Sequence, residues 1–180
     1  MAFVLAVGAL VAAAHDEGLA WLEWRVVVNN SMVVPGTARK FNSYNEPSVN
    51  VDGLVVFRAR STGGGAAGEP AQGVFIRQMG PETAIRTVFD RNTLVPSPNN
   101  LESDFVEPPS FPRVDMWSAT VASRGNHSPV WQYVEDGAQV RGGTTGIYTD
   151  PFGTLITGAS NLGAAPGFAF FAVPAIREPE

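Results

Sequence analysis

One sequence pattern occurs three times in this chain, and this repetition constrains the fold more than any single residue does. The segment Arg25-Val-Val-Val-Asn-Asn-Ser-Met-Val-Val-Pro-Gly36 recurs as Arg86-Thr-Val-Phe-Asp-Arg-Asn-Thr-Leu-Val-Pro-Ser97. A looser third copy extends from Leu155 to Gly167. Repetition at this spacing indicates a chain built from similar supersecondary units.

Two shorter motifs recur within the same units. Glu46-Pro-Ser-Val is followed later by Glu107-Pro-Pro-Ser-Phe, and Gly73-Val-Phe-Ile is followed by Gly146-Ile-Tyr-Thr. Because the second copy aligns with the first over a continuous stretch, we expect Glu46 and Glu107 to occupy equivalent positions in successive units.

The composition favours strands over helices. The chain has 19 Gly and 14 Pro among its 180 residues, and no stretch shows a sustained helical period. Segments rich in β-branched and aromatic residues alternate with turn sequences such as Asp52-Gly53, Asp136-Gly137 and Pro151-Phe-Gly153. The strands predicted from this pattern are Phe3–Val7, Ala20–Val28, Gly53–Ala59, Gly73–Gln78, Ala84–Phe89, Trp117–Ala122, Pro129–Val134, Thr145–Thr149, Thr154–Thr157 and Phe168–Val173.

The strands and repeats together predict an all-β single domain of three propeller-like units, covering roughly residues 1–54, 55–117 and 118–180. The chain opens and stops out of phase with its own unit, and three units are fewer than the roughly 4–8 blades that close a propeller. We therefore expect a homodimer, or another closed oligomer. In this arrangement the C-terminal segment pairs with Met1–Val7, either within one chain or between two.

The first residues allow two interpretations. Residues 2–14 form an uninterrupted apolar run that ends in three alanines, as in a signal peptide, although no Lys or Arg precedes it. The repeat favours a buried β-strand instead, because Ala2–Val7 stands upstream of Gly18-Leu-Ala-Trp-Leu as Val56–Ser61 stands upstream of Gly73. The run is shorter than the roughly 20 residues that span a bilayer, so we expect no membrane segment.

A resemblance to a known class of protein rests on three segments. They are Pro47-Ser-Val-Asn-x-x-Gly-Leu-Val-Val-Phe-Arg-Ala59, Gly146-Ile-Tyr148, and the stretch from Leu155 to Gly167. Together they resemble uncharacterised repeat proteins of environmental bacteria, which are usually secreted or surface-anchored and whose repeats are thought to form propeller-like blades. The resemblance implies a secreted or cell-surface location and carries over no catalytic residue. The chain departs from the pattern at Phe111-Pro-Arg-Val, where the Asn-x-x-Gly turn is replaced.

Charge and residue types exclude several classes of function. The formal net charge of −5, without any run of basic residues, argues against nucleic-acid binding. The chain has no Cys, which excludes disulfides, thiol catalysis and thiolate metal sites. It has two His, which are a weak basis for a metal site, so we expect a structural or solvent role for His127 in a loop at Arg124–Ser128. The run Gly63–Gly68 lacks the Lys and Ser or Thr of a phosphate-binding loop and is predicted to form a hairpin tip.

The acidic residues Glu46, Asp104 and Glu107 are the catalytic candidates, and Asp104 lies three residues before Glu107. Two carboxylates at a suitable separation supply the acid and the base or nucleophile of a glycoside hydrolase. Carboxylates that recur on one face of an array are also suited to bind Ca²⁺ through hard oxygen ligands. The simplest alternative is that each Glu-Pro pair ends a strand in solvent, with no metal or other cofactor.

Three aromatic residues are the candidates for ligand binding: Trp131, Tyr133 and Tyr148. Exposed aromatic faces hold sugar rings by stacking, and the spacing of Trp131 and Tyr133 places both rings on one face of a strand. The alternative is that these rings pack in the core or between units. Two functional hypotheses follow: an extracellular binding or structural module directed at carbohydrate, and a small glycoside hydrolase that uses a pair of carboxylates.

Overall fold

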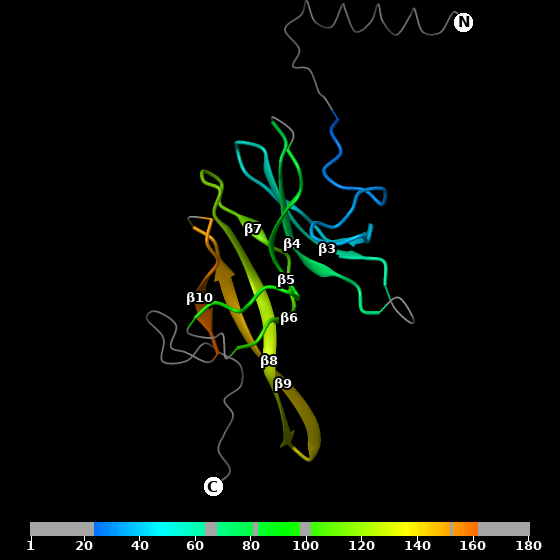
Figure 1. The fold of residues 1–180 in the computed structure, drawn as a ribbon. Helices are drawn as coiled ribbons and strands as arrows, with labels where there is room; N and C mark the ends of the chain where they lie inside the picture. The colour runs from blue at the N-terminus through cyan, green and yellow to red at the C-terminus, as the bar shows by residue number, and fades with distance from the viewer. Residues whose placement is uncertain (1–23, 64–67, 81–82, 98–101, 152, 162–180) are drawn as a thin grey trace, which may run out of the picture.

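The computed structural model describes residues 24–63, 68–80, 83–97, 102–151 and 153–161, and within 129–135 and 139–143 it describes the backbone alone. The described chain forms two antiparallel five-stranded sheets without any helix, so the predicted all-β fold is confirmed (Figure 1). No helix in this part of the chain is long and apolar enough to cross a membrane. The first sheet contains β1 (Phe41–Tyr44), β2 (Ser48–Val49), β3 (Leu54–Ser61), β4 (Gln72–Gln78) and β5 (Arg86–Asp90). The second contains β6 (Phe105–Glu107), β7 (Arg113–Val114), β8 (Val121–Glu135), β9 (Ala138–Thr149) and β10 (Ile156–Ser160).

The two sheets share one topology. The first has the order β1-β3-β4-β5 with β2 on β3, and the second has β6-β8-β9-β10 with β7 on β8. Both sheets also carry irregularities at the same places, within the pairing of the first strand and within the pairing of the last strand. The sequence repeat is therefore a structural repeat in the described residues. The hydrogen-bonded sheets span residues 41–90 and 105–160. Each sheet therefore crosses a predicted unit boundary, near residue 55 in the first sheet and near residue 118 in the second.

The recurring glycine of the Gly73 and Gly146 motifs is explained by a close approach of the next strand. A Cβ built on Gly73 would lie 2.7 Å from the carbonyl oxygen of Phe89, and a Cβ on Gly146 would lie 2.7 Å from that of Ala159. A Cβ atom cannot stand this close to a carbonyl oxygen, so only glycine fits at either position. In both sheets the last strand shifts its register beside this glycine. The predicted equivalence of these two motifs is confirmed.

The Asn-x-x-Gly turn of the first unit is held by one amide side chain. Oδ1 of Asn50 accepts hydrogen bonds from the backbone N–H groups of Asp52 (3.1 Å) and Leu54 (2.8 Å), and Gly53 adopts a positive φ of 77°. Nδ2 of Asn50 donates to the carbonyl oxygen of Ser118 in the second unit, at 2.9 Å. In the second unit Asp115 takes this place and accepts the N–H of Trp117 at 2.9 Å. The motif thus closes a turn and also ties the two units together.

Two apolar clusters hold the fold together, one on each face of the first sheet. Side chains on β3 alternate between the faces, so Val56 and Val55 belong to different clusters. The cluster between the sheets contains Leu54, Val56, Val74, Ile76, Phe89, Val95, Phe105, Val121 and Tyr148. The cluster on the other face contains Val34, Phe41, Val55, Phe57, Ala59 and Phe75, covered by Val27, Val28 and Met32.

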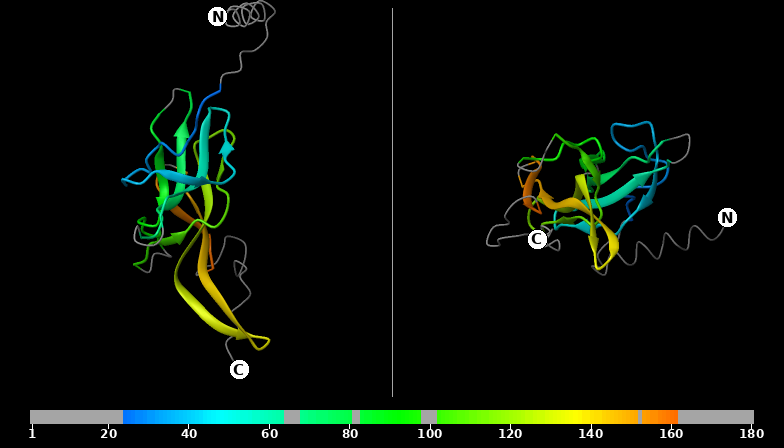
Figure 2. Two further views of the ribbon diagram at one scale, coloured as in Figure 1. Left: turned by 90° about the vertical axis from the view of Figure 1, so that its right-hand side faces the viewer. Right: turned by 90° about the horizontal axis from the view of Figure 1, so that it is seen from below.

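Three strand predictions need correction. Residues 117–120 of the predicted strand Trp117–Ala122 are not in a strand, because β8 begins at Val121. Residues 24–28 are not a strand, although Val27 and Val28 pack against the first sheet. The segment Arg124–Ser128, predicted as a loop, is part of β8, and the register shifts between His127 and Val130. Pro129 has no N–H to donate to a neighbouring strand. It lies at this register shift, where the regular pairing is interrupted, so the long strand can contain it. Figures 1 and 2 show the hairpin of β8 and β9 projecting beyond the body of the two sheets. The predicted strands Phe3–Val7 and Phe168–Val173 lie outside the described residues.

Candidate functional site

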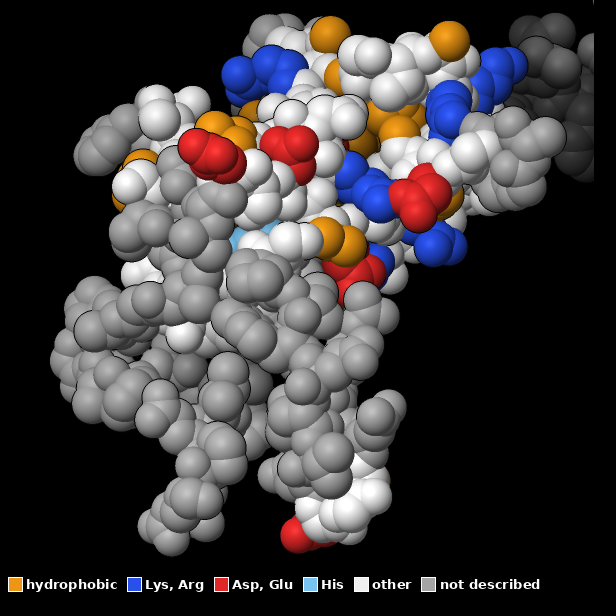
Figure 3. Space-filling view, turned by 60° about the horizontal axis from the view of Figure 1, so that its bottom comes forward, with side chains coloured by type: hydrophobic (Ala, Val, Ile, Leu, Met, Phe, Trp, Pro, Cys, Tyr) orange, Lys and Arg blue, Asp and Glu red, His pale blue; other side chains and the backbone are white. Residues whose placement is uncertain are grey.

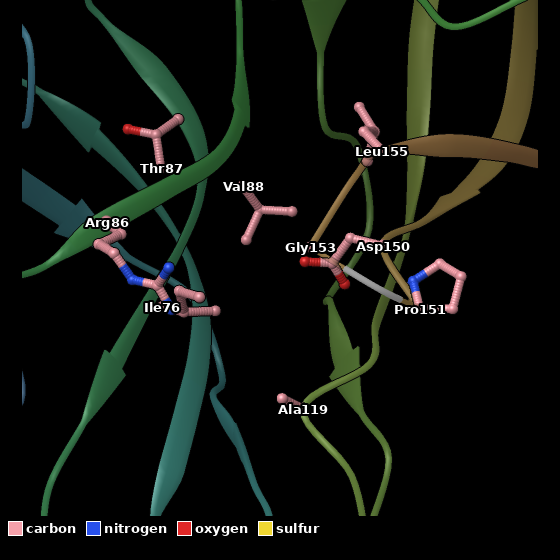
Figure 4. Close-up of a pocket in the computed structure, with 9 residues that line it drawn as sticks. All are labelled: Ile76, Arg86, Thr87, Val88, Ala119, Asp150, Pro151, Gly153 and Leu155. Atoms are coloured by element: carbon pink, nitrogen blue, oxygen red, sulfur yellow. The ribbon is translucent and has the colours of Figure 1, made fainter.

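A pocket of about 250 Å³ lies at one end of the seam between the two sheets. It opens where β4 ends and β5 begins, opposite the loops that precede β8 and follow β9. Figure 4 shows Arg86 and Ile76 on one side and Asp150, Pro151 and Leu155 on the other. The residues that line the pocket are Ile76, Arg86, Thr87, Val88, Ala119, Asp150, Pro151, Gly153 and Leu155.

Asp150 is fixed at the end of β9 by hydrogen bonds to the start of β8. Its Oδ1 accepts the N–H of Val121 at 2.7 Å, and its own N–H donates to the carbonyl oxygen of Val121 at 3.1 Å. The N–H of Gly153, which has a φ of 76°, donates to the carbonyl oxygen of Asp150 at 3.1 Å and closes the predicted turn. The carboxylate is therefore held in one position at the edge of the pocket.

Arg86 is the cationic group of the pocket. It opens β5, where it pairs with Ile76 of β4, and its side chain is exposed. Burial raises the pKa of Asp150, while the hydrogen bond from Val121 and the charge of Arg86 lower it in part. A carboxylate and a guanidinium thus face one space lined by the apolar side chains of Ile76, Val88 and Leu155.

This arrangement suits a small neutral ligand that both donates and accepts hydrogen bonds. An ionised carboxylate only accepts hydrogen bonds, and a guanidinium only donates them. Hydroxyl groups satisfy both, and the apolar walls provide contact for C–H groups between them.

The predicted acidic residues do not line this pocket. Glu46 is exposed in the connection between β1 and β2, and Asp104 is exposed beside the start of β6. Glu107 is half-buried on β6, where one carboxylate oxygen accepts a hydrogen bond from Nδ2 of Asn126 at 3.3 Å.

Glu46 and Glu107 are also not equivalent, contrary to the expectation from the repeated Glu-Pro. Glu107 pairs with Asn126 on β8, as Ser43 pairs with Arg60 on β3. The second unit has a longer connection between its first two strands, so the motif copies fall at different points of the sheets. No group of three or more His, Asp or Glu side chains among the described residues is suited to hold a metal ion.

Tyr148 is not a surface platform for a ligand. Its side chain is 1% exposed, and its ring packs edge to face on Phe105, with centroids 4.7 Å apart and planes at 87°. Trp131 and Tyr133 are two residues apart on the projecting part of β8, where only the backbone is described. His127 is buried against Phe105 and Tyr148, in agreement with a structural role, and burial lowers its pKa.

The sequence analysis missed both charged residues of the pocket. Arg86 opens the second copy of the longest motif, and Asp150 directly follows Gly146-Ile-Tyr-Thr, at the place where Arg77 follows Gly73-Val-Phe-Ile. The change from the basic Arg77 to the acidic Asp150 at one repeat position was the sequence signal that could have identified Asp150 as a candidate.

No protein-family model, no curated protein and no solved structure matches the chain.

Proposed function

We propose that this protein is an extracellular binding module of propeller-like units, and that the pocket between its two sheets holds a neutral carbohydrate. The observation that carries this proposal is the opposition of Arg86 and Asp150 across the pocket (Figure 4). The resemblance to secreted repeat proteins of bacteria supports the extracellular location.

The size and lining of the pocket favour a single sugar unit. Pockets for drug-sized ligands measure roughly 300–1,000 Å³, and this pocket of about 250 Å³ is smaller. Sugar hydroxyl groups donate to the carboxylate of Asp150 and accept from the guanidinium of Arg86. The side chains of Val88 and Leu155 then contact the C–H face of the ring.

The residues that line the pocket are better suited to bind a carbohydrate than to hydrolyse one. A glycoside hydrolase commonly needs two carboxyl groups, one on each side of the glycosidic bond. Among the nine described lining residues, Asp150 is the single carboxylate. The glycoside hydrolase with Glu46, Asp104 or Glu107 is therefore the weaker hypothesis.

The propeller-like arrangement belongs to the same proposal. It is supported by the shared strand order of the two sheets and by the apolar cluster between them. The sequence analysis leads us to expect that two copies of the chain close the array. Sedimentation equilibrium at micromolar concentration checks it: we expect a dimer, and a stable monomer contradicts closure by two copies.

The ligand is sought by screening the full chain against a panel of immobilised neutral glycans and then measuring affinity by calorimetry. We expect Asp150→Asn and Arg86→Gln to abolish detectable binding, whereas Arg60→Gln, an exposed arginine at the other end of the first sheet, leaves it unchanged. Equal binding by all variants rules out the pocket. Release of sugar products from chromogenic glycosides by the unaltered chain favours the glycoside hydrolase instead.

A further inference from the structure

The end of the first sheet opposite the pocket is basic, although the whole chain carries a net charge of −5. We call this surface the basic end, and it consists of Arg39, Lys40, Arg58, Arg60 and Arg91. These residues directly precede β1, lie in the second half of β3 or directly follow β5, and antiparallel pairing brings these segments to one end of the sheet. Figure 3 shows Lys and Arg side chains in several groups over the upper part of the molecule, with Asp and Glu side chains among them.

Strand pairing places these cations within reach of one extended ligand. Arg60 pairs with Gln72 on β4, and Gly73 pairs with Asp90, the residue before Arg91. Strands lie about 4.8 Å apart, so the backbones of Arg60 and Arg91 stand roughly 10 Å apart, about one Debye length at roughly 0.1 M salt. Their positive potentials therefore overlap.

One carboxylate of the chain already occupies this surface. Glu69, whose side chain is 74% exposed, forms an ion pair with Arg91, and its carbonyl oxygen accepts a hydrogen bond from Arg39. An exposed ion pair contributes little to stability, so an incoming carboxylate can replace that of Glu69. The nearby Asp90 is held in its turn, because its Oδ1 accepts hydrogen bonds from the N–H of Asn92 and the hydroxyl of Thr93.

A further cation on the same face lacks a complete set of partners. Nε of Arg58 is buried and has no hydrogen-bond partner. Arg58 and Arg60 are two residues apart on β3, so their side chains share one face of the sheet.

We propose that the basic end docks an acidic polysaccharide, with a uronate carboxylate taking the place of the Glu69 carboxylate beside Arg91. A uronate chain carries one charge per sugar, which matches a few cations spaced across a sheet. Double-stranded DNA carries one charge per roughly 1.7 Å and calls for a denser basic surface than five residues on an acidic chain provide. This inference does not depend on the pocket, because none of the five residues of the basic end lines it.

The test measures binding of the full chain to polygalacturonate by microscale thermophoresis, with fully methyl-esterified polygalacturonate as the uncharged control polymer. We expect binding of the first polymer only, weaker at 200 mM than at 50 mM NaCl. Arg91→Gln and Arg60→Gln should each weaken binding by about fivefold or less, the range of exposed charge pairs, and both together by more. Glu69→Gln should strengthen binding, because it removes the competing carboxylate.

Arg113→Gln is the matched control, since it removes an exposed arginine of β7 in the second sheet and should leave the affinity unchanged. Asp150→Asn should also leave it unchanged, which separates this result from a failure of the pocket proposal. Equal binding of the esterified polymer, weaker binding by Glu69→Gln, or equally tight binding of a DNA duplex overturns the inference. Unfolding curves of the variants confirm that each one is folded.

Discussion

Phe75 and Tyr148 occupy the same position in the two sheets, two residues after the recurring glycine, and each ring meets a phenylalanine of the first strand edge to face. The centroids of Phe41 and Phe75 are 5.2 Å apart with planes at 90°, and those of Phe105 and Tyr148 are 4.7 Å apart with planes at 87°. Edge-to-face pairs of this kind contribute about 0.5–1.5 kcal/mol beyond the burial of their area. One aromatic pair therefore forms the core of each repeat unit.

Tyr148→Phe should raise the free energy of unfolding. The hydroxyl of Tyr148 is buried without a hydrogen-bond partner, and its burial raises the pKa to about 12. An unsatisfied buried hydroxyl costs about 1–3 kcal/mol, and Phe75 shows that the repeat accommodates the ring without it. Urea unfolding measures the difference, and a loss of more than about 1 kcal/mol in Tyr148→Phe would mean that the hydroxyl has a partner.

Gly73→Ala and Gly146→Ala should each lower the free energy of unfolding by about 1–3 kcal/mol, the range for overpacked sites. In both variants the new methyl group meets a backbone carbonyl oxygen at 2.7 Å. Gly80→Ala is the control, because a Cβ at Gly80 meets no atom within 4 Å. The explanation of the repeated glycine is wrong when all three variants unfold at the same urea concentration.

Asn50→Ala should destabilise the protein by about 2–3 kcal/mol, since three hydrogen bonds of about 0.5–1.5 kcal/mol each are lost. Asn92→Ala provides the comparison, because the Asn92 side chain is exposed and the carboxylate of Asp90 holds that turn. The expected change for Asn92→Ala is within about 0.5 kcal/mol. Thermal unfolding of both variants tests the role of Asn50, and an unchanged melting temperature for Asn50→Ala contradicts it.

The repeat and the turn residues made much of the fold predictable. The strands β3, β4 and β5 begin and end within two residues of the predicted ranges, and Gly53, Gly137 and Gly153 have the positive φ that their turns require. These features depend on local backbone chemistry, which short sequence patterns express. The strands β2 and β7 have two residues each and were not predicted, because their pairing depends on β3 and β8 rather than on their own pattern.

The pocket was not predictable in the same way. Arg86 and Asp150 are far apart in the sequence, and only the stacking of one sheet on the other brings them to one space. Glu46 and Glu107 were singled out because each precedes a proline, and the longer connection between the first two strands of the second unit shifts the motif to a different place in its sheet. A repeated motif identifies equivalent core positions more reliably than equivalent surface positions, because packing fixes only the former.

Asp150→Asn should make the ligand-free protein more stable at neutral pH. The folded state raises the pKa of Asp150, so it binds the proton more tightly than the unfolded state does. The contribution of Asp150 to stability is therefore most favourable below the unfolded pKa of about 4 and becomes less favourable as the pH rises through the folded pKa. Unfolding free energies of both proteins from pH 3 to 7 should diverge as the pH rises. A constant difference between them contradicts the raised pKa.

Amide chemical shifts of the ¹⁵N-labelled full chain, measured while a neutral glycan selected by the panel is titrated in, test the pocket most directly. We expect the amide signals of Thr87, Val88, Gly153 and Leu155 to shift in a saturable way, because these residues line the pocket. The same titration of Asp150→Asn should leave these signals in place. Saturable shifts that avoid these residues, or that persist unchanged in Asp150→Asn, would contradict the binding of carbohydrate between the two sheets.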